Sequence, residues 1–176
     1  MQEVSLIPLD SALIDAITHG ASDIEASYGI RITNVMEWSA DVARQTAPLF
    51  ARLPRSWPWG GYLAASSSSG DGPESSTRRQ VVGTCAFKDG PNAEGVVEIA
   101  YFIYPPYEGR GIATAMARAL IAIARSQPNA PQVIAHTLPE RNASTRVLEK
   151  SGLRFAGEVI DPEDGRVWRW ELDRGE

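Results

Sequence analysis

The sequence lacks the features that mark a secreted or membrane-bound chain. Cys85 is its one cysteine, so no disulfide can form within the chain, and a reducing compartment is expected. The first residues contain no basic segment followed by a long apolar one, as a signal peptide would, and no apolar run approaches the length of a membrane span. We therefore expect a cytoplasmic protein that does not bind membranes.

An excess of positive charge is absent as well. The 176 residues include 17 lysines and arginines and 22 aspartates and glutamates, which gives a formal net charge of −5. Nucleic acids are bound by basic patches, so they are not expected partners, whereas a cationic amine is compatible with this charge. With 43% hydrophobic residues, the length fits a single domain over residues 1–176. The Ser- and Gly-rich stretch 66–80 is predicted to be a flexible loop within it.

Two common phosphate-binding motifs are also missing. No Gly-Lys-Ser/Thr occurs, which excludes the Walker motif, and the turn G-R-G-I-A-T has no third glycine in register for a dinucleotide fingerprint. The chain instead contains E-I-A-Y-F-I-Y-P-P-Y-E-G-R-G-I-A-T-A-M over residues 98–116. This pattern predicts a buried strand over 96–104, ended by Pro105 and Pro106, and a helix from near Gly111 to about Ser126.

A glycine turn between a strand and a helix can hold a phosphate, because several N–H groups point outward and the helix dipole favours an anion. An ordinary strand–helix unit with a glycine turn is the alternative. The rest of the chain alternates strands with helices: strands are predicted near 3–9, 62–65, 81–88, 132–138, 155–160 and 166–172, and helices after Asp10, within 34–52 and from Asn142. The strand–helix–strand order predicts that 132–138 pairs in parallel with 96–104.

Two blocks of the sequence resemble the GCN5-related N-acetyltransferase (GNAT) family. The first block is Glu108-Gly109-Arg110-Gly111-Ile112-Ala113. It is similar to the family's pyrophosphate-binding signature, Gln/Arg-x-x-Gly-x-Gly/Ala, with an acid at the position where Gln or Arg is usual. The second block, N-A-S-T-R-V-L-E-K-S-G-L at 142–153, is similar to the family's Asn-x-x-Ser block and follows in the family order. The branch that acetylates ribosomal-protein N-termini is the most similar.

The resemblance implies an α+β fold, with a mixed, splayed, mostly antiparallel sheet of about six or seven strands and about four flanking helices. It implies acetyl-CoA as co-substrate and no metal. The pantetheine arm would pair with the main chain of Phe102 and Ile103, and Asn142 would hold its end. The pyrophosphate would bind the residues from Glu108 to Thr114, with charge added by Arg110. Relatives often dimerise, so a homodimer is a candidate state.

Acetyl transfer to an amine needs a group that takes the amine proton and a donor for the departing thiolate. Glu98 is the first candidate base, because it lies on the central strand among apolar residues; a surface acid or an arginine partner is the alternative. His136, on the paired strand, is the other candidate base, or a satisfied strand histidine. Ser144 matches a family position that can donate to the thiolate, or it caps its helix.

The tyrosine that many family members place after this last helix is missing from residues 153–155. Tyr101, Tyr104 and Tyr107 are expected to pack in the core instead. Two tryptophans, in R-S-W-P-W-G-G-Y at 55–62, form either a substrate-facing loop or a lid on the core. Cys85 has no evident activating partner, so it is expected to be a packing residue and not a nucleophile.

The leading hypothesis is therefore an acetyl-CoA-dependent N-acetyltransferase. It would transfer the acetyl group directly to a primary amine, a protein N-terminus or a small amine, in a ternary complex. The first alternative is a non-catalytic acyl-CoA-binding or regulatory domain. The second is a nucleotide-binding domain that uses the same turn.

Overall fold

The computed structural model describes residues 3–20, 23–52, 57–67, 79–129, 131–162 and 164–172. Its elements in chain order are β1 (Val4–Pro8), α1 (Ser11–His19), α2 (Ile24–Tyr28), β2 (Ile30–Arg31), η1 (Thr33–Val35), α3 (Met36–Arg52), β3 (Gly61–Ser66), β4 (Arg79–Phe87), β5 (Val96–Ile103), η2 (Pro105–Tyr107), α4 (Ile112–Arg125), β6 (Gln132–Thr137), α5 (Ala143–Lys150), β7 (Leu153–Asp161) and β8 (Gly165–Leu172). Most of the predicted loop 66–80 lies outside the described residues, and its two ends belong to β3 and β4.

The strands form one mixed sheet in the order β1-β3-β4-β5-β6-β8-β7, with β2 beside β4. All neighbours are antiparallel except β5–β6 and the short β2–β4 pair. The mixed, mostly antiparallel sheet is thus confirmed. The described residues hold eight strands and five α-helices, more than the predicted six or seven and four. The additional elements include α2 and β2, which are five and two residues long and too short to leave a periodic pattern.

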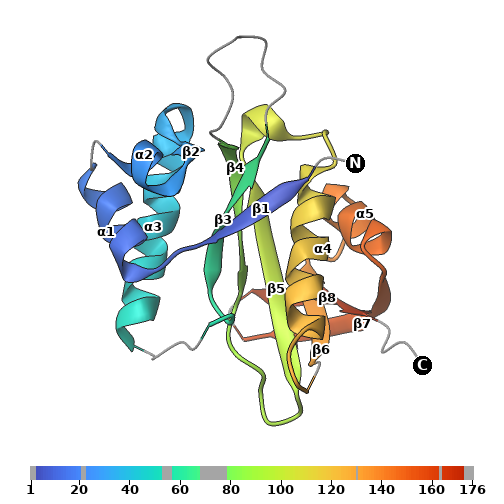
Figure 1. The fold of residues 1–176 in the computed structure, drawn as a ribbon. Coiled ribbons are helices and arrows are strands. Elements are labelled where there is room, and N and C mark those ends of the chain that lie inside the picture. Colours follow the sequence, from blue (N-terminus) through green and yellow to red (C-terminus); the bar gives the residue numbers. More distant parts are fainter. Residues whose placement is uncertain are drawn as a thin grey trace.

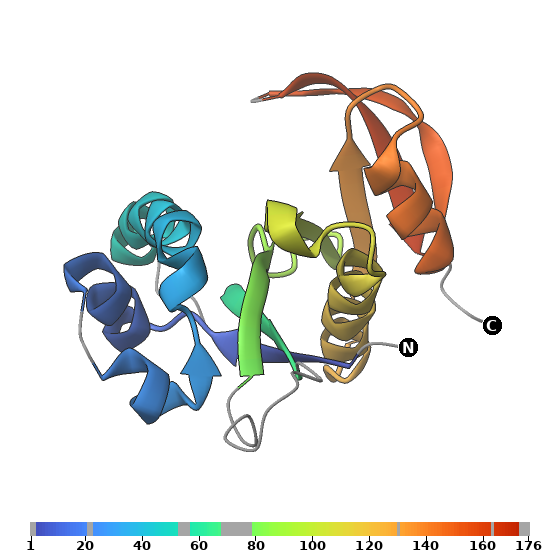
Figure 2. The ribbon, with the colours of Figure 1, turned by 90° about the horizontal axis from the view of Figure 1, so that it is seen from above.

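The predicted parallel pairing of β5 with β6 is confirmed, but it is short. It runs from Val96↔Gln132 to Glu98↔Ile134 and then ends, although β5 continues to Ile103 and β6 to Thr137. Beyond this point the two strands diverge. Figure 2 shows the β6–β8 part of the sheet turned away from β5. This divergence opens the sheet in its middle, and the candidate site lies there.

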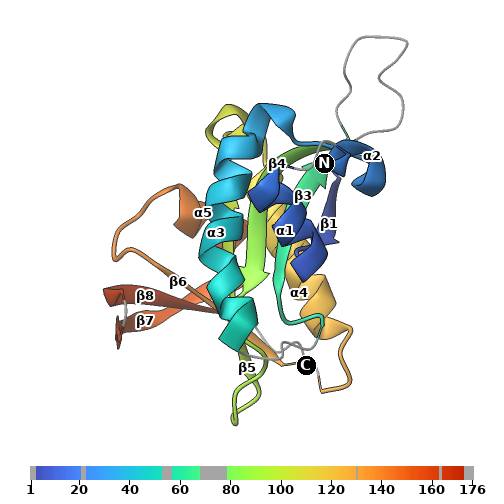
Figure 3. The ribbon, with the colours of Figure 1, turned by 90° about the vertical axis from the view of Figure 1, so that its left-hand side faces the viewer.

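Helices cover both faces of the sheet (Figure 1). On one face, α4 buries Met116 and Leu120 against Val97 and Ile99 of β5. On the other face, α1 and α3 lie in front of the sheet, as Figure 3 shows. They enclose a second core that includes Tyr104, the residue that follows β5. β5 itself contributes Val97 and Ile99 to the first core, and Tyr104, directly after the strand, anchors its end in the second core.

Candidate active site

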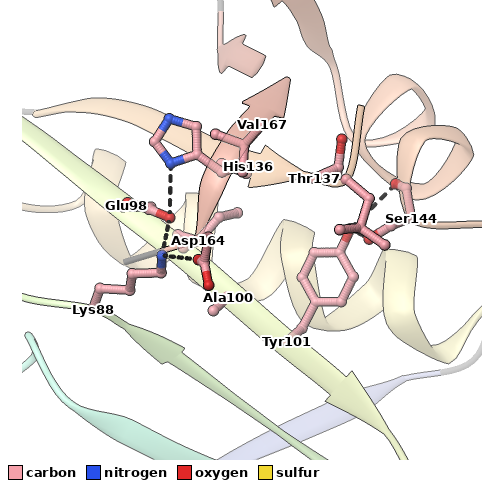
Figure 4. A pocket seen from close by; sticks show the side chains of 12 residues that line it. Lys88, Glu98, Ala100, Tyr101, His136, Thr137, Ser144, Asp164 and Val167 are labelled. Carbon is pink, nitrogen blue, oxygen red and sulfur yellow. Dashed lines mark hydrogen bonds and ion pairs between the residues drawn. The ribbon is translucent and has the colours of Figure 1, made fainter. Parts of the chain in front are cut away.

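A pocket of about 330 Å³ opens where the β5–β6 pairing ends (Figure 4). Its walls come from β5, β6, the N-terminal turn of α5, the residue after β4 and the β7–β8 hairpin. The lining residues are Lys88, Glu98, Ile99, Ala100, Tyr101, Ala135, His136, Thr137, Leu138, Ser144, Asp164 and Val167. The pocket brings together three residues predicted from the sequence, namely Glu98, His136 and Ser144.

One side of the pocket carries charge, and we call it the base side (Lys88, Glu98, His136 and Asp164). Glu98 Oε1 lies 2.6 Å from Lys88 Nζ and 3.1 Å from His136 Nδ1. Lys88 Nζ also lies 3.9 Å from Asp164 Oδ2. The side chain of Glu98 is 18% exposed and that of His136 11%, so both are largely shielded from water. The carboxylate of Glu98 therefore joins a lysine and a histidine from two other elements.

His136 is held close to Glu98 without a hydrogen bond of good geometry. Neither of its ring nitrogens has a hydrogen-bond partner among the described residues, and both atoms are buried. Because buried imidazole nitrogens are normally hydrogen-bonded, this arrangement favours a pocket residue over a satisfied strand histidine. An unbonded ring nitrogen beside a carboxylate can accept a proton.

Lys88 is a cation fixed by its neighbours. Burial alone would lower the pKa of its ammonium, but the hydrogen bond and charge of Glu98, together with Asp164 and Asp161, raise that pKa above its ordinary value. The protonated form of the lysine therefore predominates, with its positive charge against the Glu98 carboxylate.

The opposite side carries hydroxyl groups, and we call it the phenol side (Tyr101, Thr137 and Ser144). The hydroxyl of Tyr101 lies 3.1 Å from Ser144 Oγ and donates to the Ser144 carbonyl oxygen at 3.3 Å. Burial raises the pKa of Tyr101, and the hydrogen bond to Ser144 opposes this in part. In Figure 4 these side chains lie across the pocket from Glu98 and His136.

The three nearby tyrosines pack against the cores as expected, since the rings of Tyr101 and Tyr107 lie against the first core, but the hydroxyl of Tyr101 has a further position. Tyr104 is fully buried, hydrogen-bonds Ser39 at 3.0 Å and stacks on Trp38. Tyr101 packs its ring against the first core and also lines the pocket, where its hydroxyl meets Ser144. The strand alternation could have separated Tyr101 from Tyr104, because they lie on opposite faces of β5, but only the placement of α5 brings Ser144 next to the phenol.

Ser144 does not cap its helix. That role belongs to Asn142, whose Oδ1 accepts a hydrogen bond from Thr145 N at 3.1 Å, while Thr145 Oγ1 accepts one from Asn142 N. Ser144 lies inside the first turn of α5, and its hydroxyl faces Tyr101. The Asn142 side chain uses its oxygen for the cap, so its amide nitrogen points to other partners.

The glycine turn (residues 108–114) joins η2 to α4. Gly109 and Gly111 have φ angles of 74° and 76°, and a Cβ at either position would meet nothing within 4 Å. The turn is therefore open and is not filled by side chains. The first helical bond runs from Ala115 N to Gly111 O, so the N–H groups of the preceding three residues have no helical acceptor. No side chain caps this helix start.

Side chains around the turn differ in what they can offer a ligand. Arg110 lies over the ring of Tyr107, with Cζ 5.6 Å from the ring centroid. Ile112 is buried in the core, so only its N–H can reach a ligand. Thr114 is half-buried, and Glu108 is exposed at the entrance of the turn. An anion at this turn would meet main-chain N–H groups and Arg110, with Glu108 as the like charge nearby.

The free edge of β5 offers main-chain groups to the opening. The main chains of Glu98 and Tyr104 form hydrogen bonds on the side of β4, and the β5 residues between them pair with β4 without a shift in register. Because alternate residues of an antiparallel strand bond to the same neighbour, Tyr101 and Ile103 direct their N–H and C=O groups away from β4. Of the two residues predicted to pair with a ligand, Ile103 therefore faces the opening. The peptide groups of Phe102 face β4, and its side chain is 50% exposed.

Cys85 and the two tryptophans of residues 55–62 differ in how they contact the core. Cys85 is buried in the core and burial raises the pKa of its thiol, which argues against a nucleophilic role. Trp59 packs edge-on against Phe87, so it acts as a lid on the core, whereas Trp57 is 44% exposed and packs on Tyr62.

Within the described ranges, no three His, Cys, Asp or Glu residues are placed to hold a metal ion. In the same ranges no helix is long and apolar enough to cross a membrane.

A comparison with protein-family profiles finds one described as an acetyltransferase (GNAT) domain, which matches residues 6–154. No curated protein sequence matches the chain significantly. Among solved structures, a putative ribosomal-protein-serine acetyltransferase from Vibrio cholerae is 12% identical, with a TM-score of 0.64, and the match covers 98% of this chain and 94% of that one.

Two other similar solved structures are of enzymes whose names give different amine substrates. RimL, a ribosomal L7/L12 alpha-N-protein acetyltransferase in complex with coenzyme A, is 12% identical with a TM-score of 0.60, over 98% of this chain and 96% of that one. A spermidine N-acetyltransferase chimera from Vibrio cholerae SpeG and hSSAT is 11% identical with a TM-score of 0.56, over 97% and 94%. At these identities the likeness shows the fold and leaves the acceptor undetermined.

Proposed function

The chain belongs to the GNAT acetyltransferase family, and from this premise we propose that it transfers the acetyl group of acetyl-CoA to a primary amine by direct attack in a ternary complex. The observation that carries the proposal is the pocket at the β5–β6 opening, which has proton acceptors on its base side and a proton donor on its phenol side. Acetyl-CoA supplies the acetyl group as an activated thioester.

The glycine turn fits the diphosphate of the coenzyme. Its open space at Gly109 and Gly111 lets a phosphate approach the backbone, and the unpaired N–H groups from Ile112 to Thr114 donate to it. Arg110 adds a positive charge. The exposed Glu108 lies at the entrance and contacts the ligand only through its main chain.

The free edge of β5 leads from the glycine turn to the pocket. In this proposal Tyr101 and Ile103 pair through their main chains with the pantetheine arm, and Phe102 covers that arm with its side chain. The amide nitrogen of Asn142 holds the end of the arm. This path brings the thioester between the base side and the phenol side, so the sheet opening positions the reacting groups.

The base side takes the proton of the attacking amine. Glu98 accepts it, and His136, 3.1 Å away, provides the route onward through its unbonded ring nitrogens. The phenol side serves the leaving group. Tyr101 donates a proton to the departing thiolate, and Ser144 orients the phenol through its hydrogen bond. Cys85 takes no part, so no covalent enzyme intermediate is needed.

An acceptor panel tests the proposal. Purified protein with acetyl-CoA is assayed for coenzyme A release with a protein N-terminal peptide, a polyamine, an amino acid and an aminoglycoside. At least one amine is expected to be acetylated, and Glu98→Gln should lower kcat roughly a hundredfold. Glu94→Gln, the same change at an exposed position outside the pocket, is the matched control. Binding of the coenzyme without turnover of any amine would instead support the acyl-CoA-binding alternative.

A further inference from the structure

The protein holds a primary amine of its own in the pocket. Lys88 follows β4, and its Nζ lies 2.6 Å from the carboxylate of Glu98 and 3.9 Å from that of Asp164. The main chains of Lys88 and Glu98 are cross-strand neighbours, joined by a 2.9 Å bond from Lys88 N to Glu98 O. The lysine side chain therefore reaches across β5 to the opening between β5 and β6 (Figure 4).

We propose that Lys88 is a self-acetylation site of this enzyme, modified at Nζ by the acetyl-CoA bound in the same pocket. The inference rests on the proposed function. Nζ already has the contact that an acceptor amine needs, a direct hydrogen bond to the proposed proton acceptor. It also belongs to the chemical class of the acceptor.

The step is a simple acyl transfer. The ammonium of Lys88 first gives one proton to Glu98. The neutral Nζ then attacks the acetyl carbonyl carbon, a C–N bond forms and the C–S bond of the thioester breaks. A second proton leaves the nitrogen to the base side, and the thiolate of coenzyme A takes a proton from Tyr101. One of the two protons lost by the nitrogen returns to the phenolate of Tyr101, so the enzyme ends in its starting state. The products are an amide at Lys88, free coenzyme A and one released proton, and no oxidant or reductant is required.

The composition of the chain makes this site easy to distinguish from chemical acetylation. Lys88 and Lys150 are the two lysines of the sequence. Lys150 is exposed at the end of α5, away from the pocket lining. Since the neighbours of Lys88 raise the pKa of its ammonium, less of it is neutral at a given pH, and uncatalysed acetylation in solution favours Lys150. A preference for Lys88 therefore requires the folded site.

The test incubates the full-length protein with acetyl-CoA that carries a deuterated acetyl group and no added amine. Intact mass and peptide mapping then locate the label. We expect Lys88 to be labelled at least about tenfold faster than Lys150, because the site holds the amine and the thioester together. The rate should not depend on protein concentration. Lys88→Arg should abolish this label, Lys150→Arg should leave it unchanged, and Glu98→Gln should slow it roughly a hundredfold.

Several outcomes would overturn the inference: no label on Lys88, equal labelling of both lysines, or a Lys88 preference that survives unfolding in denaturant. An unlabelled acetyl group already on Lys88 at isolation is compared between the wild-type and Glu98→Gln proteins. If the Glu98→Gln protein is isolated without that acetyl group, the inference is supported; if the variant carries the same amount, the inference is contradicted. The acceptor panel is run in parallel on the same protein. Acetylation of a free amine with no label on Lys88 would reject self-acetylation alone and leave the proposed function standing.

Discussion

The residues of the pocket divide its chemistry between two sides of one opening. Glu98 and His136 lie on adjacent strands and can take a proton, whereas Tyr101 and Ser144 lie across from them and can give one. A general acid or base is useful only within hydrogen-bond reach of the reacting group. In the proposed reaction, the amine therefore lies on the base side and the thiol on the phenol side.

Tyr101→Phe tests the phenol side. The substitution keeps the ring and removes the proton donor, so kcat should fall roughly a hundredfold while KM for acetyl-CoA changes little. Since burial raises the pKa of Tyr101 above 10.0, the wild-type phenol stays protonated throughout the usual assay range. Steady-state kinetics of both proteins measure this. Tyr28→Phe, on α2 and outside the pocket lining, is the control. An unchanged kcat in Tyr101→Phe would remove this residue from the mechanism.

Much of this site could be predicted from the sequence, because Glu98, His136 and Ser144 follow from a strand pattern and a recognisable block. Tyr101 could not. Its own pattern is that of an apolar strand position, and its hydroxyl acquires a role only because α5 returns to lie beside β5. A contact between residues 43 positions apart depends on topology and not on local pattern.

The elements around the pocket meet at their ends. The parallel β5–β6 ladder stops after three residue pairs, the glycine turn starts α4 without a side-chain cap, and α5 begins with a capping box. The end of the ladder and the uncapped start of α4 leave main-chain groups free at the place proposed for the coenzyme. Among the elements, the helix after Gly111 and the strand before Pro105 were predicted well. The short α2 and β2 were missed, because elements of five and two residues are too short to show a period.

Gly111→Ala tests the glycine turn. A methyl group at φ 76° strains the backbone and should lower the free energy of unfolding by about 1 kcal/mol. It also projects into the open space proposed for the diphosphate, so the thermal shift caused by saturating coenzyme A should shrink. Gly20→Ala is a matched control, because Gly20 ends α1 at φ 68° with equally open surroundings. It should lose similar stability and keep the full shift. Equal shifts in both variants would contradict the proposed binding turn.

Gly83→Ala tests the support of β5. A Cβ at Gly83 would lie 2.4 Å from Phe102 O, a main-chain atom that cannot move without displacing the strand. The free energy of unfolding should fall by roughly 1–3 kcal/mol, as for overpacking in other cores. Chemical denaturation measures this. A fully stable variant would show that β4 and β5 are less tightly fixed than the register indicates.

The whole molecule is a sheet with one core on each face, and the proposed active site lies at the opening between β5 and β6. The first core holds β5 through Val97 and Ile99, and the second core holds the residue after it, Tyr104. Several tyrosines lie in these cores. Burial raises the pKa of both Tyr62 and Tyr104 to about 12. The charge of Cys85 adds a smaller increase in the pKa of Tyr62, and the hydrogen bond with Ser39 partly opposes the increase at Tyr104.

These buried tyrosines predict an alkaline loss of stability. Above pH 10 they ionise in the unfolded chain before they do so in the folded one, so the folded state binds more protons. Below pH 10 both tyrosines are protonated in the folded and unfolded chain, so they should not make the free energy of unfolding depend on pH. Above it, stability should fall with a slope approaching about 1.4 kcal/mol per pH unit for each tyrosine. Denaturation at a series of pH values measures the slope. Tyr62→Phe and Tyr104→Phe together should flatten it, and an unchanged slope would show that other groups control the loss.

Isothermal titration calorimetry of the wild-type protein with acetyl-CoA tests the central claim most directly, since both the proposed reaction and self-acetylation require the coenzyme to occupy the glycine turn and the sheet opening. We predict a saturable isotherm with one site per chain, and no comparable heat with ATP or NAD. A flat trace with acetyl-CoA, or tighter binding of either nucleotide, would contradict the account.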